Sequence, residues 1–143
     1  KVSLSFLTQL VHIQLTPNNE VFRDKCEESR TNLVNILRQQ KEAGRRIVGY
    51  AATSKSTTVL NYCNIGPDLI EFISDTTPIK QGKFSPGMHI SVRSHEALQN
   101  GYPDCFLLFA WNHKVEIMEK ESSFTQAGGE WISYVPHVEI IRK

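Results

Sequence analysis

The pattern of apolar positions alternates between short buried runs and stretches with helical spacing. The predicted strands are residues 47–51, 69–75, 88–92, 104–111, 130–135 and 138–141. The predicted helices are residues 16–43, 57–63, 94–98 and 115–122. Strands that alternate with helices predict an α/β fold, a three-layer α/β/α Rossmann-like arrangement around a parallel sheet.

The amino-terminal third precedes this alternation. Residues 1–15 alternate in part and predict one or two strands, and Thr16-Pro17 is a favourable helix start. The apolar stripe of the following helix weakens at residues 29–31, where a break or bend is expected, and Gly44 ends the helix. We expect a single domain over residues 1–143, with 1–44 as amino-terminal strands and helix and 45–143 as the Rossmann-like core.

The segment 46–63 predicts a strand, a tight polar turn and a helix. Residues 52–56 form a small-residue turn around one cation, Lys55, and hydroxyl side chains surround it at Thr53, Ser54 and Ser56. The amide groups at a helix start carry partial positive charge and bind phosphate. The turn is therefore either an anion site or a plain strand-to-helix connection with a solvated lysine.

Two further polar segments follow predicted strands. Asp75 ends the second strand, where an acid holds a ribose hydroxyl in dinucleotide-binding folds, although aspartate also caps turns. Because the carboxyl ends of parallel strands share one edge of the sheet, residues 52–56, 75–82 and 111–114 predict one site there. We expect His95 on the surface of a short helix, and Glu119 and Glu121 on a solvated helix face.

Composition narrows the function classes. The 143 residues are 40% hydrophobic with a formal net charge of +1, which argues against a nucleic-acid partner or a polybasic membrane patch. No apolar run is long enough to span a membrane and no signal-peptide pattern opens the chain. Three cysteines without a C-x-x-C pair indicate a reduced, cytoplasmic compartment. The histidines show no metal-ligand spacing, and G-x-G-x-x-G and Walker A motifs are missing.

Several local motifs together resemble a known family. They are Gly49-Tyr50-Ala51-Ala52-Thr53-Ser54-Lys55, Leu60-Asn61-Tyr62-Cys63, Ile65-Gly66-Pro67-Asp68-Leu69-Ile70, Asp75, Pro78, Lys80-Gln81-Gly82, Pro86-Gly87, His89-Ile90 and Trp111-Asn112. This set, over residues 45–120, resembles the carboxyl-terminal domain of SAM-dependent sugar C-methyltransferases. Those enzymes methylate a carbon of a keto-deoxysugar linked to a nucleoside diphosphate.

The resemblance implies a domain that holds the nucleotide-sugar and does not bind S-adenosylmethionine, the cofactor expected in a central domain of the same chain or of a separate subunit. Its implied substrate-binding residues are Tyr50, Ser54, Lys55, Ser56, Asp75, Lys80, Gln81, His89, Trp111 and Asn112. Lys55 would neutralise the diphosphate. No catalytic base and no metal ligand are assigned, and the chain alone is expected to be inactive.

Departures from the family pattern keep other functions open. Ala51 and Ser56 stand where the family commonly has glycine, and His113 stands where an apolar residue is usual. One alternative is a non-catalytic Rossmann-like module that binds a dinucleotide or coenzyme A. Another is a docking domain, which would expose an apolar face on residues 1–15.

Overall fold

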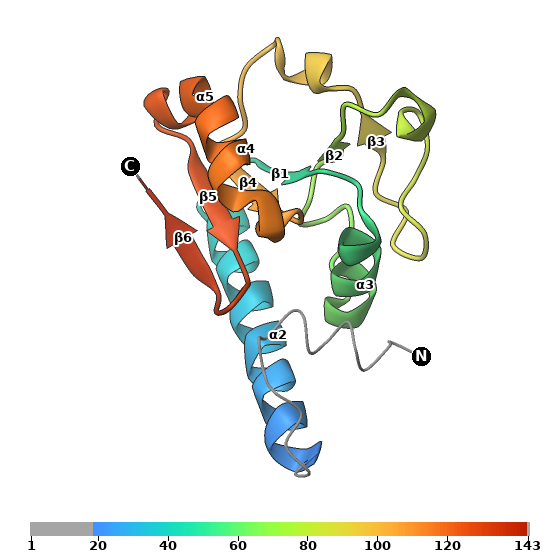
Figure 1. The fold of residues 1–143 in the computed structure, drawn as a ribbon, viewed down its shortest axis with the longest axis vertical. Coiled ribbons are helices and arrows are strands. Elements are labelled where there is room, and N and C mark those ends of the chain that lie inside the picture. The colour runs from blue at the N-terminus through green and yellow to red at the C-terminus, as the bar shows by residue number, and fades with distance from the viewer. Residues whose placement is uncertain (1–18, 143) are drawn as a thin grey trace.

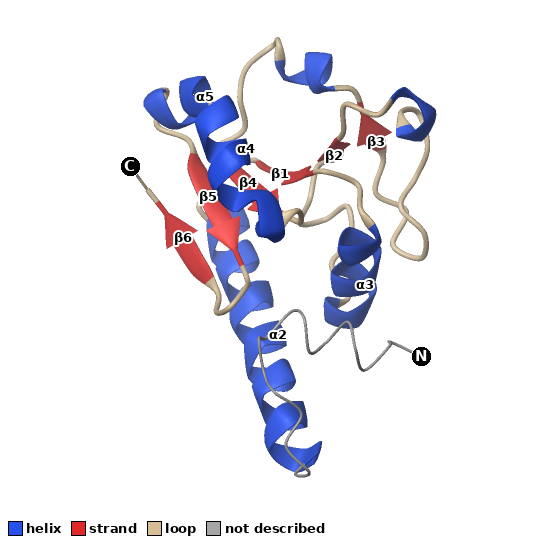
Figure 2. Ribbon diagram, viewed as in Figure 1, coloured by secondary structure: helices blue, strands red, loops and turns tan. Residues whose placement is uncertain are grey.

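The computed structural model describes residues 19–142, so the strands expected in residues 1–15 and the helix start at Thr16 lie outside the described residues. The described chain forms a six-stranded sheet in the order β3-β2-β1-β4-β5-β6 (Figures 1 and 2). The strands are β1 (Ile47–Tyr50), β2 (Ile73–Ser74), β3 (Val92–Arg93), β4 (Cys105–Leu108), β5 (Glu130–Ser133) and β6 (Glu139–Ile141). Strands β1 to β5 pair in parallel and β6 is antiparallel to β5. The predicted Rossmann-like α/β sheet is confirmed, with one antiparallel edge strand.

Helices cover both faces of this sheet. They are α2 (Asn19–Glu42), α3 (Ser54–Cys63), α4 (Lys114–Lys120) and α5 (Ser122–Gln126), with short 3-10 helices at Pro78–Lys80, His95–Leu98 and Trp111–His113. Neighbouring strand residues point to opposite faces. Ile47 therefore packs with Leu37 of α2 and Leu60 of α3, whereas Val48 joins Phe124 of α5 on the other side. Within residues 19–142, no helix combines the length and apolar character that crossing a membrane requires.

Helix α2 runs without interruption through residues 29–31, so the break expected there is wrong. Cys26 and Leu33 lie two helical turns apart on one face, and both are buried. Their packing holds the helix in place across the weak part of the stripe. The helical spacing was therefore a better guide than the local gap in apolar residues.

The second and third strands are much shorter than predicted. The amides of Leu69 and Ile70 donate to the carbonyl of Gly66, so they form a turn and do not join the sheet. Residues 83–92 form a hairpin, in which the backbone amide of Ser85 donates to the carbonyl of Ile90 at 2.8 Å. Because that hairpin uses the backbone groups of residues 88–92, only the last of them reaches the sheet.

The helix predicted over residues 115–122 is broken into α4 and α5 at Glu121. The break leaves Glu121 only 6% exposed, so the expectation of a solvated glutamate there is wrong. Ser94 precedes the 3-10 helix as predicted, but its side chain makes no capping hydrogen bond. The corrections matter for function because Glu121 and the residues of the short helix meet near the end of β1.

Candidate functional site

The turn after β1 forms the start of helix α3, which begins at Ser54, three residues earlier than predicted. The reason is a capping box. The Thr53 hydroxyl accepts from the Ser56 amide at 3.2 Å, and the Ser56 hydroxyl accepts from the Thr53 amide at 3.1 Å. The amides of Ser54 and Lys55, at the first two helical positions, have no acceptor inside the helix. This end of α3 can therefore donate to a ligand.

Asp75 joins this turn to the loop after β2. Its carboxylate accepts from the Ala52 amide at 2.7 Å and from the Thr77 amide at 2.8 Å. Lys80 Nζ lies 3.3 Å from the carboxylate and donates to the Ala52 carbonyl at 2.8 Å. Burial alone would raise the pKa of Asp75, but the hydrogen bonds from Thr77, Ala52 and Lys80 outweigh it and lower that pKa. The carboxylate thus caps both turns and holds them together, which is the alternative to ribose binding that the sequence left open. We call this arrangement the turn clamp.

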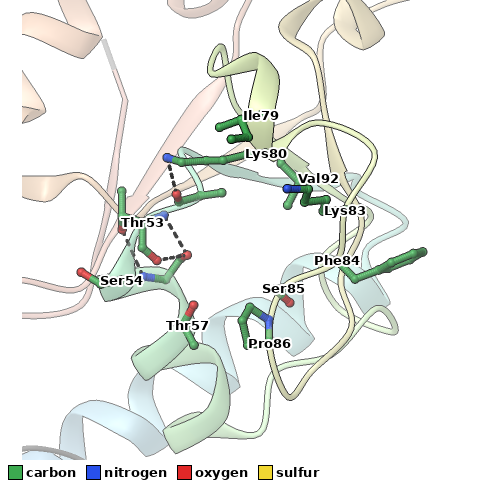
Figure 3. Close-up of a pocket in the computed structure, with 12 residues that line it drawn as sticks. Thr53, Ser54, Thr57, Ile79, Lys80, Lys83, Phe84, Ser85, Pro86 and Val92 are labelled. Carbon is green, nitrogen blue, oxygen red and sulfur yellow. Dashed lines mark hydrogen bonds between the residues drawn. The ribbon is translucent and has the colours of Figure 1, made fainter.

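A cavity of about 410 Å³ lies between the start of α3 and residues 79–86 (Figure 3). We call it the α3 pocket. Its lining residues are Ala52, Thr53, Ser54, Ser56, Thr57, Ile79, Lys80, Lys83, Phe84, Ser85, Pro86 and Val92. Two of them are lysines, five carry hydroxyl groups on or beside α3 or in the loop, and none of this described lining is acidic. The cavity therefore has the chemistry of an anion site.

The far wall of the α3 pocket is the hairpin of residues 83–92. Asn61 of α3 fastens it, because its side-chain amide donates to the Pro86 carbonyl at 2.9 Å. Gly87 has φ +83°, and a Cβ atom there would collide with the Asn61 side chain. Glycine is thus required at this position both for the backbone conformation and for the close approach.

A second cavity of about 200 Å³ lies beside the ends of β1 and β2, and we call it the His95 pocket. Its lining residues are Tyr50, Ala51, Thr53, Ser74, Asp75, Thr76, Thr77, Lys80 and His95. The sequence predicted a surface position for His95, but its side chain is half-buried between two polar partners. Its Nδ1 lies 3.1 Å from the Ser74 hydroxyl, and its Nε2 lies 3.4 Å from a carboxylate oxygen of Glu121.

The second oxygen of Glu121 accepts from the Tyr50 hydroxyl at 2.7 Å. Burial, followed by this hydrogen bond, raises the pKa of Tyr50, so the phenol stays protonated and donates. Trp131 packs edge-on against the Tyr50 ring at 5.5 Å between centroids. The group of Tyr50, Glu121, His95 and Ser74 is therefore a connected polar chain set in an aromatic core.

The predicted site residues divide between these two cavities and the surface beyond them. Ser54, Ser56 and Lys80 line the α3 pocket, and Tyr50, Asp75 and Lys80 line the His95 pocket. The others, which line neither cavity, are Lys55, Gln81, His89, Trp111 and Asn112.

Lys55 lies against Trp111, whereas its predicted role is to neutralise the diphosphate of the substrate. Its Nζ lies 5.8 Å from the centroid of the Trp111 ring, at cation–π distance. Gln81 donates to the Asp75 carbonyl at 3.0 Å and so supports the turn clamp. His89 is exposed at the tip of the hairpin with φ +55°. Their assignment to substrate remains a prediction.

Sequence reasoning assigned no site role to Lys83, Ser74, His95 or Glu121. Lys83 had a visible signal, since it is a second cation in the loop that holds Lys80. Glu121 had none, because it lies 71 positions from Tyr50 and in a run of charged residues. Among residues 19–142, no group of three or more histidine, cysteine or acidic side chains is placed to hold a metal ion.

Comparison with known proteins places the chain in one family. The model of the C-methyltransferase C-terminal domain matches residues 12–136. The chain is also similar to the C-methyltransferase NovU of Streptomyces niveus, with 37% identity over 120 residues. That match covers 84% of this chain and 29% of the relative, so the chain spans less than a third of that protein's length. The protein therefore belongs to the C-methyltransferase C-terminal domain family.

Proposed function

We propose that this chain is the nucleotide-sugar-binding domain of a SAM-dependent C-methyltransferase that acts on a keto-deoxysugar linked to a nucleoside diphosphate. The observation that carries the proposal is the α3 pocket, with Lys80, Lys83 and the start of helix α3 at Ser54 around one cavity. Two cations and a helix start favour a ligand with about two negative charges, which a diphosphate supplies.

The same cavity is a poor fit for S-adenosylmethionine. That cofactor carries a sulfonium and an ammonium group against one carboxylate, so its net charge is positive, and Lys80, Lys83 and the positive end of α3 disfavour a net cation. Asp75, the acid predicted to hold a ribose hydroxyl, does not line this cavity, and its carboxylate already accepts hydrogen bonds from Ala52 and Thr77. We therefore propose that the cofactor binds in another domain, either of the same parent chain or of a partner subunit.

The role of this chain in methyl transfer would then be to bind and orient the substrate. Deprotonation beside a ketone needs a base held at the reacting carbon. We assign no such base here and place it with the cofactor-binding domain. Anchoring the diphosphate in the α3 pocket would fix the ligand at one end, which lowers the entropic cost of positioning the sugar.

The test is calorimetric titration with a deoxythymidine diphosphate sugar, with NAD and S-adenosylmethionine as comparison ligands. Lys83→Met is the informative variant, because Lys83 is exposed and lines the cavity but does not clamp the turn. Lys120→Met, at the exposed end of α4, is the matched control. We expect Lys83→Met to weaken the nucleotide-sugar about threefold to tenfold and the control to leave it unchanged.

Other results would contradict the proposal in recognisable ways. Preferred binding of NAD would support the dinucleotide-binding alternative, and tight binding of S-adenosylmethionine would overturn the separation of roles. A nucleotide-sugar that binds equally well to Lys83→Met would remove the α3 pocket as its site. Lys55→Ala, run beside these variants, tests whether the lysine that faces Trp111 contributes.

A further inference from the structure

The His95 pocket adjoins the α3 pocket and shares two of its walls. Thr53 and Lys80 line both cavities. Pockets that hold an entire small-molecule ligand usually measure roughly 300–1,000 Å³. At about 200 Å³, the His95 pocket suits one ring of a ligand whose remaining part lies next door.

The two cavities differ in chemistry. The α3 pocket offers Lys80 and Lys83 beside a helix start, whereas the His95 pocket shares Lys80, contains the clamped carboxylate of Asp75 and adds several hydroxyl and ring-nitrogen groups. Those groups are the hydroxyls of Thr53, Ser74, Thr76 and Thr77 and the imidazole of His95. Hydroxyl and imidazole groups each combine donor and acceptor capacity, which matches ligand hydroxyls that also do both.

The Ser74–His95 pair is held in position for such a contact. With Nδ1 of His95 3.1 Å from the Ser74 oxygen, the serine hydroxyl either donates to the ring or accepts from it. In both cases it keeps one hydrogen-bonding function for a ligand. Behind the ring, Glu121 lies 3.4 Å from Nε2 and is itself anchored by the Tyr50 hydroxyl.

Burial of the Glu121 carboxylate lowers the free energy of unfolding relative to an apolar side chain at the same position. The residue is 6% exposed, and apolar side chains such as Phe106 and Trp131 surround Tyr50. An apolar replacement for such a buried polar set is often neutral or stabilising. An apolar side chain at position 121 could not orient the imidazole of His95, as Glu121 does.

We propose that the His95 pocket receives a hydroxylated sugar ring of the ligand whose diphosphate lies in the α3 pocket. Ser74 and His95 contact the ring hydroxyls, and Glu121 is a positioning residue that orients the imidazole. This inference rests on the proposed function, since the diphosphate fixes the ligand next to the second cavity. The ring is either the pentose of the nucleoside or the attached hexose, and the two sources can be separated by experiment.

The experiment titrates the chain with two matched pairs of ligands. UDP and UDP-glucose differ by the hexose, and dUDP and UDP differ by the 2′-hydroxyl of the pentose. We expect the wild-type chain to favour the more hydroxylated member of at least one pair by about threefold to tenfold, the effect of one or two hydrogen bonds. The pair that shows the preference identifies the ring.

The variants are Ser74→Ala and His95→Asn, with Ser123→Ala and His137→Asn as matched controls on the exposed surface. We expect both site variants to bring the ratio of the two dissociation constants in the preferred pair close to one. The less hydroxylated ligand should still bind within about twofold of its wild-type affinity. Both controls should keep the preference. Ser74→Ala removes a single oxygen atom, so it tests the proposal even if His95→Asn does not fold.

Glu121→Gln tests the positioning role, because glutamine still accepts from Tyr50 but lacks the charge that faces His95. We expect it to reduce the preference without weakening the less hydroxylated ligand; a purely structural role would weaken both members equally. Binding of UDP with no wild-type preference in either pair, or a preference unchanged in Ser74→Ala and in folded His95→Asn, would overturn this inference alone. Failure of these nucleotides and of the deoxythymidine diphosphate sugar to bind would overturn the proposed function, and this inference with it.

Discussion

Replacing Asp75 by asparagine tests the clamp that holds the site together. The carboxylate joins the turn after β1 to the loop after β2 through Ala52, Thr77 and Lys80. Asparagine has the same shape but one acceptor oxygen, and its NH₂ group faces an amide that needs an acceptor. The substitution therefore removes a charge-assisted hydrogen bond and leaves one buried amide unpaired.

The expected cost follows from these contacts. Loss of a hydrogen bond to a charged group removes about 1.5–3 kcal/mol of the free energy of unfolding. The Lys80 contact adds about 0–1 kcal/mol, because that lysine is 41% exposed and its attraction is screened. We expect Asp75→Asn to lower the free energy of unfolding by about 1.5–4 kcal/mol at pH 7.

The cost should also depend on pH. The pKa of Asp75 in the folded chain is lowered from the ordinary value of 3.8. Its contribution is fully present above the unfolded pKa and is lost as pH falls through the folded pKa. The difference between wild type and Asp75→Asn should therefore be large at pH 7 and shrink below pH 3.8.

Urea denaturation followed by tryptophan fluorescence at pH 7 and at pH 3 measures both effects. With a slope of about 2 kcal/mol per molar urea, the midpoint at pH 7 should fall by about 0.7–2 M. Asp24→Asn, on the exposed face of α2, is the control and should stay within about 0.5 kcal/mol of wild type. A cost for Asp75→Asn below about 0.5 kcal/mol, or one that is equal at both pH values, would refute this account of the clamp.

Three further substitutions or reactions test other parts of the structure. Thr53→Ala removes the capping hydroxyl at the start of α3 and should cost about 0.5–2 kcal/mol in urea denaturation; an unchanged midpoint would contradict the capping box. Gly129→Ala places a Cβ atom against the fully buried ring of Phe124 and should lower the free energy of unfolding by about 1–3 kcal/mol, seen as a lower melting temperature. Burial raises the pKa of Cys63 to about 12 and of Cys105 to about 11, so both thiols should react with Ellman's reagent at pH 8 far more slowly in the native chain than in urea; equal rates would refute their burial.

The sequence alone determined the class of the fold and its central elements. The runs that became β1 and β4 are apolar on both faces, as a strand buried between two layers must be. Helix α2 was found from its spacing because a period of 3.6 repeats over many residues. These signals are local, so a single chain displays them without any knowledge of the tertiary structure.

Strand limits were less predictable, because they depend on which backbone groups find partners. Leu69 and Ile70 have the composition of a strand, but their amides bond to Gly66 in a turn. Residues 88–91 likewise lose their place as a sheet strand to the hairpin with residues 83–85. A propensity for extended structure does not specify which extended partner the segment takes.

The candidate site shows the same division. The chain itself displayed the polar turn after β1, Asp75 and the cation Lys80, since each follows or lies near a recognisable strand. Only the tertiary structure turned Lys55 toward Trp111 and paired Glu121 with Tyr50 and His95. The physical reason is that hydrogen bonds and ion pairs depend on distances in space, and residues 71 positions apart in the chain carry no sign of one another until the two layers pack.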